Sequence, residues 1–262
     1  MLITSLQNPR VKQALKLRES RRRKHDQLML VEGGDELSLA LDCGLKPTTL
    51  FFCPALVGNN DDLLEKTRAA GAEIIQVSQS VFEKLAYREN PDGWLAVAPL
   101  LQRSLEALSL GASPLLIVAE AVEKPGNLGA ILRTADAAGV EGVIVCNPTI
   151  DLGNPNLIRA SRGTVFSVPI IEATSTDTLA WLRARRVKVV AASPEGAVGY
   201  TGVDFRGPTA IVVGEESAGL SPVWRDGADL NVRIPMMGRV NSLNVSIAAA
   251  LFVYEALRQR LP

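Results

Sequence analysis

The chain has 262 residues, of which 47 % are hydrophobic, and its formal net charge is zero. That length suits one large domain or two modest ones, and the composition suits an ordinary packed core. No apolar run approaches the roughly 20 residues that a membrane-spanning helix needs, and the first residues lack a signal-peptide pattern. We therefore expect a soluble, cytoplasmic protein that does not enter a membrane.

Metal chemistry and histidine-based catalysis find little support in the composition. The three cysteines, Cys43, Cys53 and Cys146, are odd in number and widely spaced, so they form neither a disulfide framework nor a metal-ligand cluster. The only histidine, His25, lies in a charged stretch, which makes a Ser-His-Asp triad or a histidine metal site hard to build. We expect no metal site, and we expect His25 to be a solvated surface residue.

Positive charge is concentrated at the beginning of the chain. Residues 1–24 contain eight basic side chains and one acid, so the remainder carries a net charge of −7. The basic residues are Arg10, Lys12, Lys16, Arg18, Arg21, Arg22, Arg23 and Lys24. Such a block indicates an anionic partner such as a nucleic acid, because phosphate neutralisation dominates nucleic-acid affinity. Charge alone equally allows a solubilising helix face that has no partner.

Helical and extended patterns alternate through the first hundred residues. The expected helices cover residues 8–23, 35–41, 61–70 and 80–87, and the expected strands cover residues 28–31, 48–53, 73–77 and 94–98. Residues 99–114 carry little strand signal and include a Gly-Ala-Ser-Pro turn, so we place a domain boundary near residue 108. The prediction is a smaller N-terminal α/β domain over residues 1–107 and a second domain over residues 108–262.

The second block is more regular than the first. Its expected strands cover residues 115–119, 142–146, 168–171, 187–191, 210–213 and 232–234, and its expected helices cover residues 127–138, 156–162, 176–186 and 242–260. Apolar strands with interleaved helices are typical of a buried parallel sheet, so the predicted fold class is α/β. In such sheets ligands bind at the carboxyl ends of strands, and three of these ends carry unusual polar residues.

The first of these strand ends leads into a segment that runs from Glu123 to Asp136. Its Pro-Gly turn puts Asn127 where a helix N-cap is expected, and capping is the better explanation for that residue taken alone. Arg133 follows in a helix of small and apolar residues, where its charge needs a partner. That partner is either a carboxylate such as Asp136 or an anionic ligand such as phosphate.

The second strand end reads Gly-Glu-Glu-Ser-Ala-Gly-Leu-Ser over residues 214–221. A phosphate loop is a weak interpretation, because two adjacent carboxylates would repel phosphate and the Gly-Lys-Ser/Thr ending of a Walker A loop is missing. A carboxylate at a strand end suits a hydroxyl, an amine or an arginine. We expect Glu215 to be a solvated loop residue and Glu216 to pair with an arginine in the site.

The third strand end reads Ile-Pro-Met-Met-Gly from residue 234, and Asn-Ser-Leu-Asn over residues 241–244 then opens a long apolar helix. Ser242 is the expected N-cap of that helix. Asn244 is a polar residue at the mouth of a buried helix and must find hydrogen-bond partners there. The helix itself is too apolar to be fully exposed to solvent.

Together these segments resemble the three motifs of the SpoU (TrmH-type) RNA ribose methyltransferases of the SPOUT superfamily. The first match is Asn127-Leu-Gly with Arg133-Thr-Ala, and the second is Gly214-x-Glu216-x-x-Gly219-Leu. The third is Ile-Pro-Met-x-Gly-x-Val-x-Ser-Leu-Asn-Val-Ser over residues 234–246. The resemblance covers about residues 112–262, and three motifs in this order are far more specific than any one of them.

The first block resembles, more loosely, the N-terminal substrate-binding domain of the longer family members. Shared features are an Asn-Pro-Arg sequence at residues 8–10, the arginine cluster at residues 21–23, and the sequences Leu-Val-Glu-Gly at 30–33 and Asn-Pro-Asp-Gly at 90–93. This resemblance favours the nucleic-acid interpretation of the basic block. The RNA-binding residues that we expect are Arg10, Lys12, Arg21, Arg22, Arg23 and Lys24.

The resemblance also implies a fold and a cofactor. The C-terminal domain would contain a deep trefoil knot, and two copies would form a homodimer with the last helix in the interface. S-adenosylmethionine would be bound in the knot, largely by backbone groups. By matched position, the cofactor-binding residues would be Gly214, Ile234, Met236, Ser242 and Leu243.

The implied reaction moves a methyl group from a sulfonium to a ribose 2′-hydroxyl of RNA. By resemblance, the catalytic residues are Asn127, Arg133, Glu216, Ser242 and Asn244. Arg133 would either accept the proton, a difficult role for a guanidinium that stays charged, or hold the adjacent phosphate and polarise the hydroxyl. The added N-terminal domain favours ribosomal RNA as the substrate. Methylation of transfer RNA and a non-catalytic RNA-binding or assembly factor are the alternatives.

Overall fold

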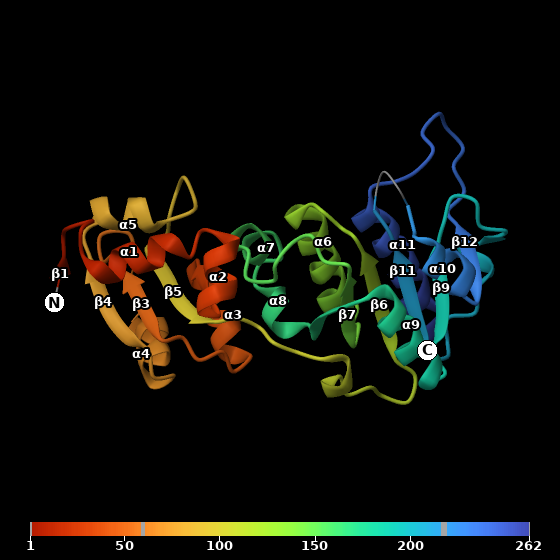
Figure 1. Ribbon diagram of the computed structural model, residues 1–262, viewed down its shortest axis with the longest axis horizontal. Helices are drawn as coiled ribbons and strands as arrows, with labels where there is room; N and C mark the ends of the chain where they lie inside the picture. The colour runs from red at the N-terminus through yellow and green to blue at the C-terminus, as the bar shows by residue number, and fades with distance from the viewer. Residues whose placement is uncertain (1, 59–60, 216–218, 262) are drawn as a thin grey trace. The chain divides into compact units, whose positions relative to one another are not determined.

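The computed structural model describes residues 2–58, 61–215 and 219–261. The chain divides into two compact units, which are described separately (Figure 1). Unit 1 comprises Met1–Leu101 and Asp151–Ser167, and unit 2 comprises Gln102–Ile150 and Val168–Pro262. The predicted division into domains at residues 107 and 108 stays a prediction, because compactness does not test which residues fold independently.

Unit 1 is built on a five-stranded mixed sheet in the order β1-β4-β3-β5-β2. The strands are β1 (Leu2–Ile3), β2 (Leu28–Glu32), β3 (Thr49–Phe52), β4 (Glu73–Val77) and β5 (Trp94–Pro99). β5 runs antiparallel to both β2 and β3, whereas β1, β3 and β4 are parallel. The helices are α1 (Pro9–Lys16), α2 (Ser20–Asp26), α3 (Gly34–Asp42), α4 (Asp61–Ala69), α5 (Gln79–Leu85), α7 (Pro155–Ala160) and α8 (Thr164–Ser167).

The helix predicted over residues 8–23 is wrong, because the chain forms two helices there. α1 ends at Lys16, and Glu19 adopts an extended conformation before α2 begins. The break leaves the backbone carbonyls of Leu17 and Arg18 available to a side chain. Arg23 donates to both of them, at 2.9 and 2.7 Å.

Unit 2 is built on a seven-stranded parallel sheet in the order β10-β12-β9-β11-β6-β7-β8. The strands are β6 (Leu115–Glu120), β7 (Gly142–Cys146), β8 (Ile170–Ala173), β9 (Lys188–Ala192), β10 (Val198–Gly199), β11 (Thr209–Val213) and β12 (Leu230–Arg233). Every residue of β6, β7 and β11 is buried, as expected for a sheet covered on both faces. The α/β class and the parallel sheet predicted from the sequence are confirmed.

Helices cover this sheet on both faces (Figure 1). They are α6 (Pro125–Ala137), α9 (Ser175–Ala184), α10 (Pro222–Gly227) and α11 (Val245–Arg260), with short 3-10 turns η1 (Leu105–Ala107) and η2 (Tyr200–Gly202). Side chains of α9 and α10, including Leu182 and Trp224, pack against Leu116 and Val212 of the sheet. The helices α6 and α11 pack against each other and contact β7 and β11.

Two predicted N-caps are corrected by the structure. Asn127 lies inside α6, because Pro125 occupies the first helical turn and Lys124 precedes it as the N-cap. Proline favours that first position, since it lacks the N–H that a helix start leaves without an acceptor. The last helix begins at Val245, so its N-cap is Asn244, whose side chain accepts from the Ser246 N–H, and not Ser242.

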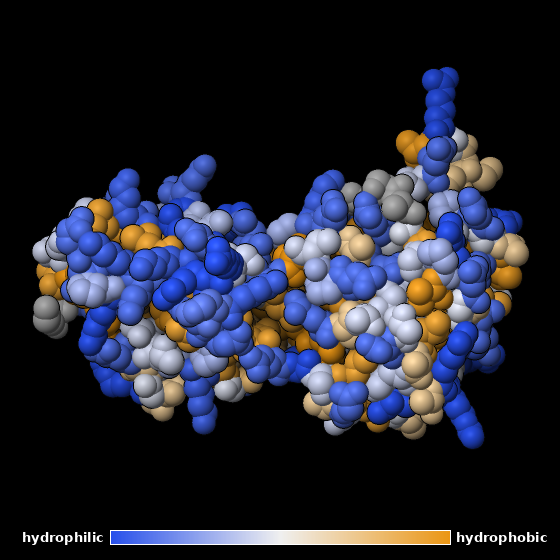
Figure 2. Space-filling view, viewed as in Figure 1, coloured by the Kyte–Doolittle hydropathy of each residue, from blue (hydrophilic) through white to orange (hydrophobic). Residues whose placement is uncertain are grey.

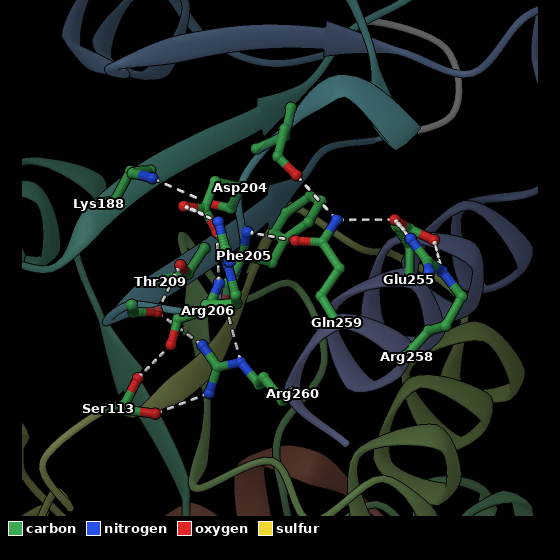
Figure 3. Close-up of polar contacts among 12 residues, drawn as sticks. Ser113, Lys188, Asp204, Phe205, Arg206, Thr209, Glu255, Arg258, Gln259 and Arg260 are labelled. Carbon is green, nitrogen blue, oxygen red and sulfur yellow. Dashed lines mark hydrogen bonds and ion pairs between the residues drawn. The ribbon is translucent and has the colours of Figure 1, made fainter. Parts of the chain in front are cut away.

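The last turn of α11 fastens this helix to the rest of unit 2 (Figure 3). Gln259 accepts a hydrogen bond from the Phe205 N–H at 2.9 Å. Arg260 donates to the backbone carbonyls of Phe205, Gly207 and Ser113, at 2.9, 2.7 and 2.7 Å. These contacts fix one end of α11, and the other end carries Asn244 and the segment that precedes it.

Candidate functional site

A cavity of about 340 Å³ lies at the carboxyl ends of β9, β11 and β12. This is the edge of a parallel sheet at which ligands normally bind. The lining includes all five residues predicted to hold the cofactor, namely Gly214, Ile234, Met236, Ser242 and Leu243. The structure therefore brings together two of the three sequence motifs around one cavity, whose size is that of a small-molecule site.

Gly214 permits a close approach of two backbone segments in the cavity wall. A Cβ atom at this position would lie 2.7 Å from the carbonyl oxygen of Gly219 and 2.8 Å from a methyl group of Leu220. Gly219 has a φ of 69°, and its N–H donates to the Glu215 carbonyl at 2.9 Å. The predicted catalytic residue Glu216 lies outside the described residues.

The cavity walls combine apolar and polar surfaces. Val213, Leu220 and Phe252 contribute apolar side chains. Glu195 and Arg225, which the sequence analysis did not single out, contribute charged groups. Apolar walls suit a flat heterocycle, and carboxylates together with backbone groups suit hydroxyl and amine donors.

A hydrogen bond joins the first motif to the third. The Asn244 amide donates to the Asn127 side-chain oxygen at 3.1 Å. The Asn244 oxygen in turn accepts from the N–H of Ser246 at 3.0 Å and from its hydroxyl at 2.6 Å. Asn244 thus finds the partners that its position requires, and it holds Asn127 beside the start of α11.

Arg133 is exposed on α6, the helix that also carries Asn127. Among the residues that the structure describes, none forms an ion pair with Arg133, so the pairing suggested with Asp136 is not found. The other partner suggested by the sequence, an anionic ligand, is thereby favoured. An exposed guanidinium with free donors is well suited to a phosphate.

Sequence reasoning missed a buried carboxylate next to this cavity. Glu120 is the last residue of β6 and is only 3 % exposed. It accepts hydrogen bonds from the backbone N–H and the hydroxyl of Ser221, at 2.8 and 2.7 Å, and from the Ser175 hydroxyl at 2.6 Å. The predicted strand stopped at Ala119, which left Glu120 as an unremarkable loop residue. The missed signal was a charged residue that directly continues an apolar strand.

The basic residues near the N-terminus are not equivalent in unit 1. Most of them are exposed or partly exposed, namely Arg10, Lys12, Arg21, Arg22 and Lys24. Arg23 is buried and forms a two-pronged ion pair with Asp151, at 2.9 and 2.7 Å. This burial removes Arg23 from the surface that could meet RNA, although the sequence analysis had grouped it with its neighbours.

The described residues contain neither a candidate membrane-spanning helix nor a candidate metal site. No helix in the described part of the chain is long and apolar enough to cross a membrane. Within residues 2–58, 61–215 and 219–261, no group of three metal-ligating side chains lies together.

The fold and the cavity define an α/β protein whose small-molecule site is formed by loops at the carboxyl ends of parallel strands. Residues 114–254 match the SpoU rRNA Methylase family, and residues 8–96 match the MRM3-like substrate binding domain. The chain belongs to the SpoU rRNA methylase family. This confirms the family and the enzyme class, an RNA methyltransferase, that the three motifs predicted.

Relatives resemble the chain over almost its full length. The 23S rRNA (guanosine(2553)-2′-O)-methyltransferase RlmP of Bacillus subtilis is 30 % identical, over 96 % of this chain and 97 % of the relative. The 23S rRNA (uridine(2479)-2′-O)-methyltransferase of Streptomyces viridochromogenes is 32 % identical, over 88 % and 83 %. The crystal structure of an AdoMet-bound rRNA methyltransferase from Sinorhizobium meliloti is similar with a TM-score of 0.92 and 33 % identity, over 100 % and 99 %.

Proposed function

We propose that this protein transfers a methyl group from S-adenosylmethionine to a ribose 2′-hydroxyl of ribosomal RNA. The observation that carries the proposal is the convergence of Gly214, Ile234, Met236, Ser242 and Leu243 on one cavity. The names of the relatives from Bacillus and Streptomyces support a ribosomal RNA target, since both are 23S rRNA 2′-O-methyltransferases. The AdoMet-bound relative supports the methyl donor.

The cavity fits this cofactor. The close approach at Gly214 leaves backbone groups on the wall, where an adenine edge can be recognised, and Leu220 and Phe252 offer apolar surface for its faces. Glu195 and Glu215 line the cavity and can accept from ribose hydroxyls or an ammonium group. When bound, the cofactor supplies a sulfonium methyl group that is already electrophilic.

The chain's own residues must orient the ribose and help its hydroxyl proton to leave. Asn244, the N-cap of α11, fixes Asn127, and it follows Ser242 of the cavity by two residues in the chain. Arg133 holds the phosphate adjacent to the target ribose and polarises the 2′-hydroxyl. We favour this role over proton acceptance, because a guanidinium stays protonated in proteins.

The N-terminal domain, over residues 1–107, is proposed to bind the RNA substrate. Arg10, Lys12, Arg21, Arg22 and Lys24 offer positive charge at or near the surface of unit 1. Arg10 forms an exposed ion pair with Glu73, and Arg22 pairs with Asp26 at 2.6 Å. The first pair is exposed and the second is partly exposed. Ion pairs open to solvent are weak, so phosphate can compete for the arginines.

The active form is proposed to be a homodimer whose interface contains α11, with the trefoil knot of the family at the cofactor site. The side chains of Ile247 and Tyr254 lie about two turns apart on α11 and are 52 % and 50 % exposed. The segment between β12 and α11 stands out from the surface of unit 2 (Figures 1 and 2). Its Met237 and Val240 side chains are also exposed. Exposed apolar side chains in this number mark an interaction surface. The proposal places the enzyme in the cytoplasm with its ribosomal substrate.

The test is mass spectrometry of nucleosides from ribosomal RNA incubated with the enzyme and labelled S-adenosylmethionine. We expect label in 2′-O-methylated nucleosides. We expect Arg133→Ala to lose methylation almost completely while calorimetry shows an unchanged affinity for S-adenosylmethionine, because Arg133 acts on the RNA. Arg133→Lys tests whether a charge alone suffices, since lysine cannot hold a phosphate in two-pronged fashion.

Other outcomes would replace the proposal. Label only in methylated bases would change the reaction, and label only in transfer RNA would change the substrate. Cofactor binding without label in any RNA would favour a non-catalytic factor. Full activity of the Arg133→Ala variant would remove Arg133 from the mechanism.

A further inference from the structure

The buried carboxylate of Glu120 has no place in the chemistry proposed above. Burying an ionised carboxylate is costly unless its oxygens are hydrogen-bonded. Every partner recorded for Glu120 among the described residues is a neutral N–H or O–H group, so no cation balances its charge. This cost suggests that Glu120 is present because of the residues that it holds in place.

Glu120 holds the chain directly beside the cofactor cavity. Its carboxylate binds both the N–H and the hydroxyl of Ser221. Ser221 follows Gly219 and Leu220, which line the cavity, and it precedes α10, whose Arg225 lines the same cavity. The contact therefore fixes the point from which two portions of the cavity wall extend.

The direction of the hydrogen bonds in this cluster is fixed. The indole N–H of Trp224 donates to the Ser175 hydroxyl at 3.1 Å, and the Asn147 amide donates to the same oxygen at 3.1 Å. An indole can only donate, so the Ser175 proton is directed to Glu120, 2.6 Å away. Both carboxylate oxygens thus face donors, and the site requires a side chain that accepts at both oxygens.

The backbone around Glu120 is also held in an unusual conformation. Ala121 has a φ of 50°, in the left-handed region that alanine rarely adopts. Its N–H donates to the Cys146 carbonyl at 2.9 Å. Strained residues of this kind persist where the surroundings determine the conformation, and they cluster at functional sites.

We infer that Glu120 is a positioning residue for cofactor binding, which sets the Gly219–Leu220 wall by anchoring Ser221. The inference rests on the proposed function, because it takes the ligand of the cavity to be S-adenosylmethionine. Glu120 does not line the cavity itself and touches no part of the reaction. It acts through the position of Ser221.

Glu120→Gln tests the inference with almost no change in shape. Its amide N–H₂ faces donors whichever way it is turned, so at least one donor is left without an acceptor. We expect the Kd and the KM for S-adenosylmethionine to rise by about tenfold, the effect of one unsatisfied buried donor. The KM for RNA, and kcat at saturating cofactor, should change little. Glu120→Asp keeps both acceptors and should recover part of the affinity.

Glu32→Gln is the matched control in unit 1. The Glu32 carboxylate is also buried at a strand end and accepts from the N–H groups of Tyr87 and Arg88, at 2.7 and 3.2 Å. This variant should lose thermal stability but keep the affinity for S-adenosylmethionine measured by calorimetry.

If Glu120→Gln does not fold, Ser221→Ala takes its place, because it removes one of the anchoring contacts outside the cavity lining. We expect that variant to show a raised Kd at an unchanged KM for RNA.

Three results would contradict these expectations. An unchanged Kd in a folded Glu120→Gln or Ser221→Ala variant would overturn the inference and leave the proposed function intact. Equal losses of cofactor affinity in Glu120→Gln and Glu32→Gln would reduce Glu120 to a general stabilising residue. Failure of the unsubstituted protein to bind S-adenosylmethionine would overturn the proposed function and the inference with it.

Discussion

At the scale of single residues, the arginines at positions 21–23 show how strongly burial decides the role of a charge. Arg21 is exposed, whereas Arg23, two residues further on in α2, is buried and paired with Asp151. Burial alone raises the pKa of Asp151, but hydrogen bonds from Arg23 and Ser20 and the charge of Arg23 outweigh it, so the net pKa is lowered. The pair therefore stabilises unit 1.

Arg23→Ala should destabilise the protein by about 3–5 kcal/mol, because it leaves the buried Asp151 carboxylate without a counter-charge. The full destabilisation should be measured at neutral pH, where the Asp151 carboxylate is ionised. It should diminish as the pH falls below about 3.9, the ordinary pKa of aspartate, since a lowered folded-state pKa contributes stability only above that range. Urea unfolding at a series of pH values measures the difference between the two proteins.

Arg21→Ala is the control for this prediction, because Arg21 is exposed. Its stability should change by less than about 0.5 kcal/mol. The salt dependence of its RNA binding should become shallower, as expected when one phosphate contact is lost. An Arg23→Ala variant of normal stability with the RNA defect expected for Arg21→Ala would return Arg23 to the binding surface.

A residue's role could be predicted from the sequence when it depends on neighbouring residues in the chain, and could not when it depends on distant ones. Gly214 and Ser242 were recognised because their motifs are contiguous in sequence, and both line the cavity. The roles of Arg23 and Glu120 depend on Asp151 and Ser221, which are distant in sequence, so no local pattern could assign them. The N-cap at Asn127 failed for a local reason, since Pro125 opened the helix two residues earlier.

At the scale of elements, α11 links the site to the body of unit 2. Its N-cap Asn244 contacts Asn127. Its last turn is bound to the loop before β11 and to Ser113, just before β6 (Figure 3). Arg260 provides most of the hydrogen bonds of this last turn. Burial lowers the pKa of Arg260, and the charge of Glu141 offsets this only in part. Backbone carbonyls accept the hydrogen bonds of the guanidinium.

Arg260→Met should lower the free energy of unfolding by about 1–3 kcal/mol, because it leaves partly buried carbonyls without donors. Arg206→Met is the matched control in the same view, since Arg206 forms only an exposed pair with Asp204 (Figure 3). That variant should unfold at almost the same temperature as the unsubstituted protein, because exposed ion pairs contribute little to stability. Equal effects in thermal unfolding would show that Arg260 contributes no more than a surface charge.

The elements that the sequence missed are short or depend on distant contacts. β1 and β10 contain two residues each and are defined by pairing with β4 and β12, not by any periodic pattern. α10 spans six residues, and Trp224 anchors it through a hydrogen bond to Ser175. The long apolar strands of unit 2 were predicted well, because full burial produces a continuous hydrophobic run.

At the scale of the whole molecule, the chain combines a region that matches a substrate-binding domain family with a region that matches the methylase family. The two matched families cover residues 8–96 and 114–254, which follows the order that the sequence analysis predicted. Unit 1 also contains residues 151–167, a segment that lies within the range matched to the methylase family. No periodic pattern could predict this arrangement, because α7 and α8 pack against β2 and α3 through contacts between residues far apart in sequence.

The proposed homodimer is the remaining property of the whole molecule. We expect light scattering to give twice the 28.0 kDa of the chain, with the exposed side chains of Ile247 and Tyr254 buried between two copies of α11. The double substitution of both residues by Glu should give a folded monomer, because two charges cannot be buried in an apolar interface without partners. Leu6→Glu, at an exposed apolar position of unit 1, should leave the mass unchanged. A dimer that survives the double substitution would place the interface elsewhere, and a monomeric unsubstituted protein would remove the second copy from the proposed active form.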